Sequence, residues 1–200
     1  MTEMELREKI RRYEPFNEQE REDKKEILRQ MEQADHILTR DNRNAHITVS
    51  AWIMDRDRKK VLMAYHNLYQ SWAWLGGHAD GDADLKAVAL KEIREESGLE
   101  SVRFVTEDIF SLEILTVDGH EKRGSYVPSH LHLNVTYLLE ADEAEVLRIK
   151  PDENSGVRWF SLEEALAACS EPWMIERVYK KLNAKVRERF GGTHGMQRGE

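Results

Sequence analysis

The stretch GGHADGDADLKAVALKEIREESGL, residues 76–99, joins a loop rich in glycine and aspartate to a segment with helical periodicity. Successive residues of a helix lie about 100° apart around its axis, and this spacing places the apolar residues in one stripe. These residues are Leu85, Val88, Ala89, Ile93 and Leu99. Glu92 and Glu96 fall within the stripe, and Glu95 flanks it. Because carboxylates on an inward face are unfavourable unless they are paired or bind metal, the segment predicts a helix that holds a divalent cation.

The spacing of this stretch resembles the Nudix box, G-x5-E-x7-R-E-U-x-E-E-x-G-U, in which U is an aliphatic residue. Gly77 matches the first glycine of the box. Two positions depart from the pattern, because Ala83 replaces the first glutamate and Lys91 replaces the arginine. In the family these two positions usually help to orient the catalytic helix. The end of the box is matched by Glu92, Ile93, Glu95, Glu96, Gly98 and Leu99.

The resemblance implies an α/β fold, the Nudix-type α/β/α sandwich with a mixed sheet, over residues 44–190. It also implies that Glu92, Glu95 and Glu96 are catalytic residues that bind Mg²⁺, with Mn²⁺ as an alternative. The acidic loop before the helix offers substitutes for the missing glutamate, namely Asp80, Asp82 or Asp84.

The pattern of the remaining chain agrees with such a sheet. Alternation of apolar and polar residues predicts strands over residues 45–55 and 130–141. A polar loop is expected over residues 118–129 and a final helix over residues 172–190, ended by the glycines that follow it. We expect residues 191–200 to form a flexible tail.

Residues 1–43 lie outside the resemblance and predict a helical extension. Pro15 separates two amphipathic segments, and Asn17 is placed to cap the second. Packing of this extension on the domain is the interpretation that we favour. A contact in a homodimer and a partial cover over the active site are the alternatives.

The composition of the chain limits the classes of partner that it is expected to bind and the cell compartment in which it is expected to lie. The formal charge of −8 disfavours binding to a nucleic-acid polymer, although a metal ion can still bridge the protein to a small phosphorylated substrate. A single cysteine, Cys169, cannot form an internal disulfide. No apolar run approaches the roughly 20 residues of a membrane helix, and the first residues lack the apolar region of a signal peptide. We therefore expect a cytoplasmic protein without a membrane partner.

Glu153 is a further candidate for the catalytic site. It lies in the turn PDENSG, just before a predicted strand. In several Nudix enzymes a loop glutamate at a comparable place is an extra metal ligand or general base. An ordinary acidic turn is the equally weighted alternative.

The histidines and two basic residues are candidates for binding substrate. His130 and His132 share one strand face, which favours a substrate contact over a metal pair because a third matching ligand is not evident. His78 follows the first glycine of the box, where it can contact phosphate or hold the turn. Lys122 and Arg123 can neutralise phosphate oxygens, or they can belong to a solvated loop.

These features together predict a Mg²⁺-dependent hydrolase that cleaves a phosphoanhydride bond in a nucleoside diphosphate linked to another group. Glu92 or Glu153 is the expected proton acceptor, and Gly77 belongs to the loop whose backbone approaches the phosphates. A Nudix-fold sensor that binds ligand without efficient catalysis is the first alternative. An enzyme similar to isopentenyl diphosphate isomerase is less favoured, because Cys169 lies far from the box.

Overall fold

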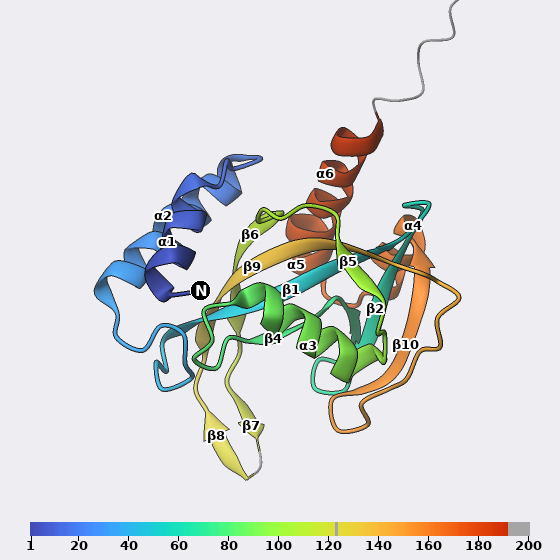
Figure 1. Ribbon diagram of the computed structural model, residues 1–200. Helices are drawn as coiled ribbons and strands as arrows, with labels where there is room; N and C mark the ends of the chain where they lie inside the picture. The colour runs from blue at the N-terminus through green and yellow to red at the C-terminus, as the bar shows by residue number, and fades with distance from the viewer. Residues whose placement is uncertain (123, 192–200) are drawn as a thin grey trace, which may run out of the picture.

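The computed structural model describes residues 1–122 and 124–191. Its centre is a mixed sheet in the order β10-β2-β1-β9-β5, with β3 beside β2, β4 beside β1 and β6 beside β9 (Figure 1). The strands are β1 (Ala45–Asp55), β2 (Lys60–His66), β3 (Ser71–Ala73), β4 (Leu75–His78), β5 (Val102–Phe104), β6 (Ser111–Val117), β9 (His130–Ala141) and β10 (Asn154–Ser161). Residues 192–200 of the predicted tail lie outside the described residues.

The two long central strands, β1 and β9, each have more than one partner on their outer side. They are parallel to each other over their whole length, with Ala45 opposite Leu131 and Asp55 opposite Ala141. The first part of β1 pairs with β4, and β2 joins only near its end. Likewise, β9 pairs first with β6 and then with β5. The sheet therefore divides, and β4, β6 and the beginnings of β1 and β9 form one end of it.

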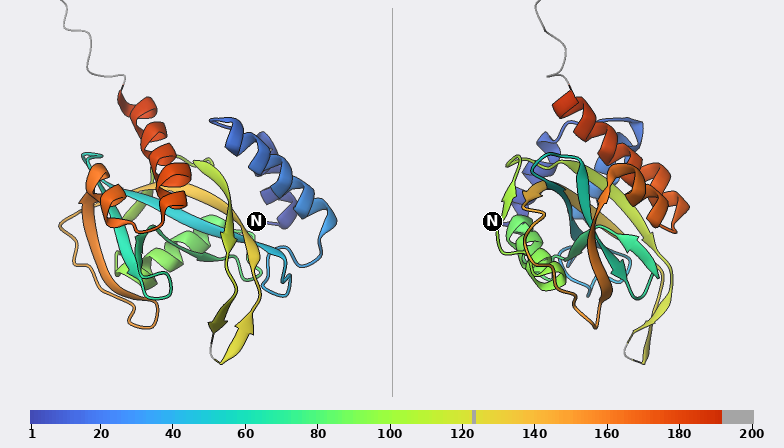
Figure 2. Two further views of the ribbon diagram at one scale, coloured as in Figure 1. Left: turned by 180° about the vertical axis from the view of Figure 1, so that it is seen from behind. Right: turned by 90° about the vertical axis from the view of Figure 1, so that its right-hand side faces the viewer.

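Helices cover both faces of the sheet (Figure 2). Helix α3 (Leu85–Ser97) packs on one face, against alternate residues of β1 such as Ile47 and Val49. The other face, with Trp52 and Met54, packs against the C-terminal helices. These are α4 (Leu162–Ala168), α5 (Pro172–Met174), the π-helical turn η1 (Ile175–Tyr179) and α6 (Lys180–Phe190). The predicted α/β/α sandwich is confirmed, although the final helix contains a π-helical turn that periodicity did not reveal.

One segment differs from its prediction. Two short strands, β7 (His120–Lys122) and β8 (Ser125–Val127), pair in the region expected to be a polar loop over residues 118–129. They project away from the sheet (Figure 1). The prediction of a loop was wrong here because backbone groups of two polar strands satisfy each other without the apolar alternation that sequence reading requires.

The N-terminal extension forms two helices, α1 (Glu3–Arg12) and α2 (Glu18–Gln33). As predicted, the side chain of Asn17 caps α2, where Oδ1 accepts the Glu20 N–H at 2.9 Å. Leu6, Ile10 and Ile27 are fully buried and belong to the same apolar core as α3. The extension thus packs on the domain. Within residues 1–122 and 124–191, no helix is both long and apolar enough to cross a membrane.

A buried set of charged residues joins the extension to the opposite face of the sheet. We call it the balanced cluster, and its charged members are Glu20, Glu113, Lys181 and Lys185. Lys181 Nζ lies 2.9 Å from Glu113 Oε1 and 3.2 Å from Glu20 Oε1. Lys185 Nζ lies 2.9 Å from Glu20 Oε1. Burial alone would raise the pKa of Glu20, but the two ammonium groups lower it to about 2.

Candidate active site

The boundaries of α3 place its glutamates in the last turns of the helix. Asp84 caps its beginning, because the side chain accepts the Ala87 N–H. Gly98 ends the helix with a φ of +75°, in the left-handed region that favours glycine, and its N–H donates to the Arg94 carbonyl. The predicted helix over the end of the box is therefore confirmed.

Three carboxylates come together beside this helix, and we call them the carboxylate group: Glu92, Glu96 and Glu153. One oxygen of each lies within 4.8 Å of the others. Asn154, which sequence reasoning missed, fixes the arrangement because its Nδ2 donates to the Glu96 carbonyl at 2.9 Å. Burial raises the pKa of Glu92, and it raises the pKa of Glu96 to about 8. Burial thus disfavours the ionised forms of Glu92 and Glu96, and a bound cation would offset this cost.

Strand β4 approaches this group through its glycines. The Gly76 N–H donates to Glu96 Oε2 at 3.1 Å. A Cβ atom on Gly77 would lie 2.6 Å from Glu92 Cδ, so any side chain there would displace the glutamate. The first glycine of the box is therefore required by packing, before any contact with substrate is considered.

Glu95, the third glutamate expected to bind metal, lies outside the carboxylate group. Lys150 Nζ is 3.0 Å from Glu95 Oε2 and 3.0 Å from Glu153 Oε1. Lys91 Nζ lies 3.2 Å from Glu92 Oε1 and 3.3 Å from Glu95 Oε1. The hydrogen bond from Lys150 lowers the pKa of Glu95. Glu153 thus joins Glu92 and Glu96 in the carboxylate group, and Lys150 connects it to Glu95, whose role as a metal ligand stays a prediction.

The acidic loop before α3 does not approach the carboxylate group. Ala83 is buried. Asp80 pairs with Arg40, and Asp82 accepts the N–H of Asp84, which itself caps the helix. All three aspartates therefore have local contacts, and the expectation that one of them replaces the missing glutamate stays a prediction.

The predicted histidines meet in a second cluster. His78, at the end of β4, contacts His132 of β9, which also contacts His130. His46 of β1, which sequence reasoning missed, packs against all three rings. The sequence did contain a sign of this role, because His46 occupies a polar position in the alternation of the first long strand. Arg123 lies outside the described residues, and Lys122 is described only as part of the β7 backbone.

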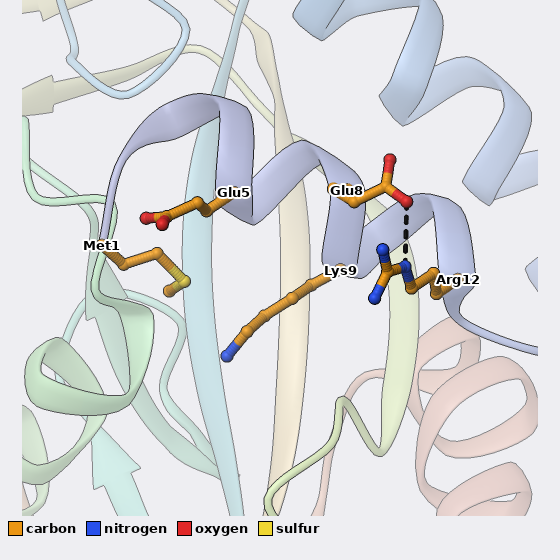
Figure 3. A pocket seen from close by; sticks show the side chains of 5 residues that line it. All are labelled: Met1, Glu5, Glu8, Lys9 and Arg12. Carbon is orange, nitrogen blue, oxygen red and sulfur yellow. Dashed lines mark hydrogen bonds and ion pairs between the residues drawn. The ribbon is translucent and has the colours of Figure 1, made fainter.

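A hollow of about 460 Å³ has no residue of either cluster in its lining. Figure 3 shows that its lining comes from α1 and the residue at the start of the chain. The lining residues are Met1, Glu5, Glu8, Lys9 and Arg12. None of these residues is a candidate for catalysis. We therefore place the candidate active site at the carboxylate group and not at this hollow.

A model of the NUDIX domain family matches residues 44–182. The chain belongs to the Nudix family. The matched segment contains the carboxylate group and the four clustered histidines, and it leaves out α1 and α2. A search of curated proteins by sequence found no match.

Solved Nudix structures share this fold at low sequence identity. A binary complex of Ap4A hydrolase from C. elegans has 19% identity and a TM-score of 0.52, covering 73% of this chain and 98% of that one. The E. coli dihydroneopterin triphosphate pyrophosphohydrolase has 14% identity and a TM-score of 0.50, covering 68% and 92%. The NUDIX domain of Shewanella oneidensis NrtR, complexed with ADP ribose, has 17% identity and a TM-score of 0.50, covering 80% and 96%. At these identities the likeness establishes the fold alone.

Proposed function

We propose that this Nudix protein is a Mg²⁺-dependent pyrophosphohydrolase that cleaves a phosphoanhydride bond in a nucleoside diphosphate linked to another group. The observation that carries the proposal is the convergence of Glu92, Glu96 and Glu153 within 4.8 Å. Family membership supports hydrolysis in general, and the position of these glutamates at the end of the box helix supports the site.

The donor set fits a hard divalent cation. Mg²⁺ prefers carboxylate oxygens, and Glu92, Glu96 and Glu153 supply three carboxylates in one place. Burial of Glu96 disfavours its ionised form, and a cation would reverse that preference. When bound, Mg²⁺ would supply charge neutralisation on the phosphates and polarisation of the phosphorus.

The protein's own residues perform the remaining tasks. Glu153, whose side chain is 40% exposed, can accept a proton from an attacking water at a carboxylate oxygen. Glu92 is the alternative acceptor. Lys150 holds Glu153 from the other side, and the bond from Asn154 to the Glu96 carbonyl keeps the turn against α3. The geometry thus supports a hydrolytic reaction with a positioned base.

Turnover with a panel of substrates tests this proposal. The panel includes nucleotide sugars, dinucleoside polyphosphates, NAD(H), coenzyme A and oxidised nucleotides, each with and without Mg²⁺. Glu96→Gln should reduce turnover at least about 100-fold, since even residues that support metal ligands are worth 10–100-fold. Glu95→Gln is the matched control on the same helix. It should reduce turnover less than Glu96→Gln does, because Glu95 lies outside the carboxylate group.

The same experiment separates the alternatives. Binding of a nucleotide without turnover would favour a sensor, and wild-type turnover by folded Glu96→Gln would contradict the metal site. An isomerase that depends on cysteine has little support, because Cys169 is buried in the core on the other face of the sheet and burial raises the pKa of its thiol.

A further inference from the structure

Four imidazoles from three strands converge at one end of the sheet. We call them the imidazole cluster: His46 on β1, His78 on β4, and His130 and His132 on β9. Strand pairing brings them together, because His46 lies opposite His132 and Thr48 lies opposite His78. The ring of His46 has its centroid 4.9–5.2 Å from the other three centroids. One ring nitrogen each of His46, His130 and His132 lies within 4.8 Å of the others.

Hydrogen bonds to backbone carbonyls orient two of the rings. His46 Nδ1 lies 3.1 Å from the Asn42 carbonyl oxygen, and His130 Nδ1 lies 2.9 Å from the Pro128 carbonyl oxygen. A carbonyl oxygen only accepts, so Nδ1 carries the proton in each neutral ring and Nε2 carries a lone pair. This is the outer hydrogen bond that metal-binding histidines ordinarily make.

The Nε2 atoms of His46, His130 and His132 are incompletely paired with one another. His46 Nε2 is buried and has no hydrogen-bond partner among the described residues. His132 Nε2 lies 3.2 Å from His130 Nε2 and 3.3 Å from His78 Nε2. A single proton on His132 Nε2 can be donated to only one of these two neighbours. A buried polar atom without a partner is unfavourable, and a cation that accepts the lone pairs of several Nε2 atoms at once would remove this cost.

The spacing fits a tetrahedral metal ion. Zinc binds histidine nitrogen at about 2.0–2.1 Å, and this places neighbouring ligand atoms of a tetrahedron about 3.3–3.4 Å apart. The separation between His130 Nε2 and His132 Nε2, 3.2 Å, is close to that value, and a ring nitrogen of His46 lies within 4.8 Å of both rings' ligand atoms.

We propose that the imidazole cluster binds one divalent transition-metal ion of the zinc class, with His46, His130 and His132 as its three protein ligands. Nitrogen donors select such an ion over Mg²⁺, whereas the carboxylate group selects Mg²⁺. The site therefore differs in chemistry from the proposed catalytic one, and it stands whether or not that activity is confirmed. The ion would tie β1 and β9 together at the end of the sheet.

Metal content of the untagged, full-length protein tests the proposal. The protein is stripped with a chelator and dialysed against Zn²⁺ in excess Mg²⁺, which occupies the carboxylates, and bound zinc is measured by mass spectrometry. We expect one equivalent per chain. Replacement of zinc by Co²⁺ should give the visible absorption of a tetrahedral nitrogen site, and Zn²⁺ should raise the melting temperature.

Variants decide which residues hold the ion. His132→Gln and His130→Gln should lose the bound equivalent and the thermal shift. His36→Asn is the matched control, because His36 is exposed and its φ of +58° suits asparagine. Glu96→Gln should keep its zinc even if it loses hydrolysis.

The proposal is overturned if the wild-type protein binds no more zinc than His130→Gln, or if Glu96→Gln loses zinc as well. Circular dichroism checks the fold of each variant. If His132→Gln does not fold, the partly exposed His130 provides the decisive variant.

Discussion

The balanced cluster and the carboxylate group both bury charge against the sheet, but they differ in how that charge is compensated. In the balanced cluster two ammonium groups face two carboxylates, and the pKa of Glu20 falls to about 2. In the carboxylate group three acids converge, and the pKa of Glu96 rises to about 8. In the first arrangement each carboxylate has an ammonium partner, whereas in the second Lys91 and Lys150 pair with Glu92 and Glu153 and, among the described residues, Glu96 has no ion-pair partner. Burial of charge alone does not identify a site, whereas a buried carboxylate without an ion-pair partner marks a candidate for one.

Deletion of residues 1–40 should have the largest effect, because it removes Glu20 from the balanced cluster together with the core residues of α1 and α2. Leu6, Ile10 and Ile27 are each 0% exposed. Burial of one such side chain contributes about 1.5–3 kcal/mol, against a typical net stability of about 5–15 kcal/mol. We expect the truncated chain to lose cooperative unfolding, measured by calorimetry. A truncated form with the wild-type melting temperature and the same oligomeric state would show that the extension is a loose tail.

Lys181→Met should have the next largest effect, since it leaves Glu113 without its ammonium partner. Removal of one partner from a buried ion pair destabilises by about 3–5 kcal/mol. Glu96→Gln in the presence of a chelator should cause no such loss, because the amide oxygen can still accept the Gly76 N–H. Urea denaturation measures both variants. Equal losses of stability in the two would contradict the difference between the clusters.

The two clusters should also respond to pH with opposite signs. Glu20 has a lowered pKa, so the stability that it contributes is present above its ordinary pKa of 4.5 and is lost as pH falls toward about 2. Glu96 has a raised pKa, so stability is present below 4.5 and is lost as pH rises toward about 8 in a metal-free protein. In a plot of melting temperature against pH, Glu20→Gln should reduce the fall at acid pH only. Glu96→Gln should reduce the fall at alkaline pH only. Melting temperature against pH, with chelator, measures both effects.

Lys91→Arg should have the smallest effect, because Lys91 is 63% exposed. Exposed ion pairs are worth about 0–1 kcal/mol, which corresponds to at most about a fivefold change in turnover. Turnover should stay the same or increase, since arginine restores the residue that the box has at this position. Combined with Ala83→Glu, it should exceed the sum of the single changes in a double-mutant cycle of turnover. Strict additivity would mean that the two positions do not interact.

Local patterns predicted most of the fold. The apolar stripe of residues 85–99 predicted α3, and alternation predicted β1 and β9 because each strand is long enough to show it. The β7–β8 pair and the turn η1 escaped prediction. The first has no apolar alternation, and the second keeps nearly helical periodicity.

The site depended on contacts that no local pattern contains. Glu153 was a candidate, but only the fold places it beside Glu96, whereas Glu95 turns toward Lys150. His46 escaped notice because its partners belong to other strands, and parallel pairing of β1 with β9 supplies the contact. Sheet pairing brings these residues together although they are far apart in the sequence. A local sequence pattern therefore cannot reveal that they are neighbours.

Strand β4 has only four residues, and it serves two clusters from opposite sides. Gly77 faces Glu92, where not even a Cβ fits, and the next residue, His78, contacts His132. Because successive residues of a strand alternate between faces, an insertion or deletion of one residue here would push an imidazole toward the glutamate and leave a glycine among the histidines. Natural length variation should therefore be excluded from Leu75–His78, and the chemistry of each cluster constrains how the other can evolve.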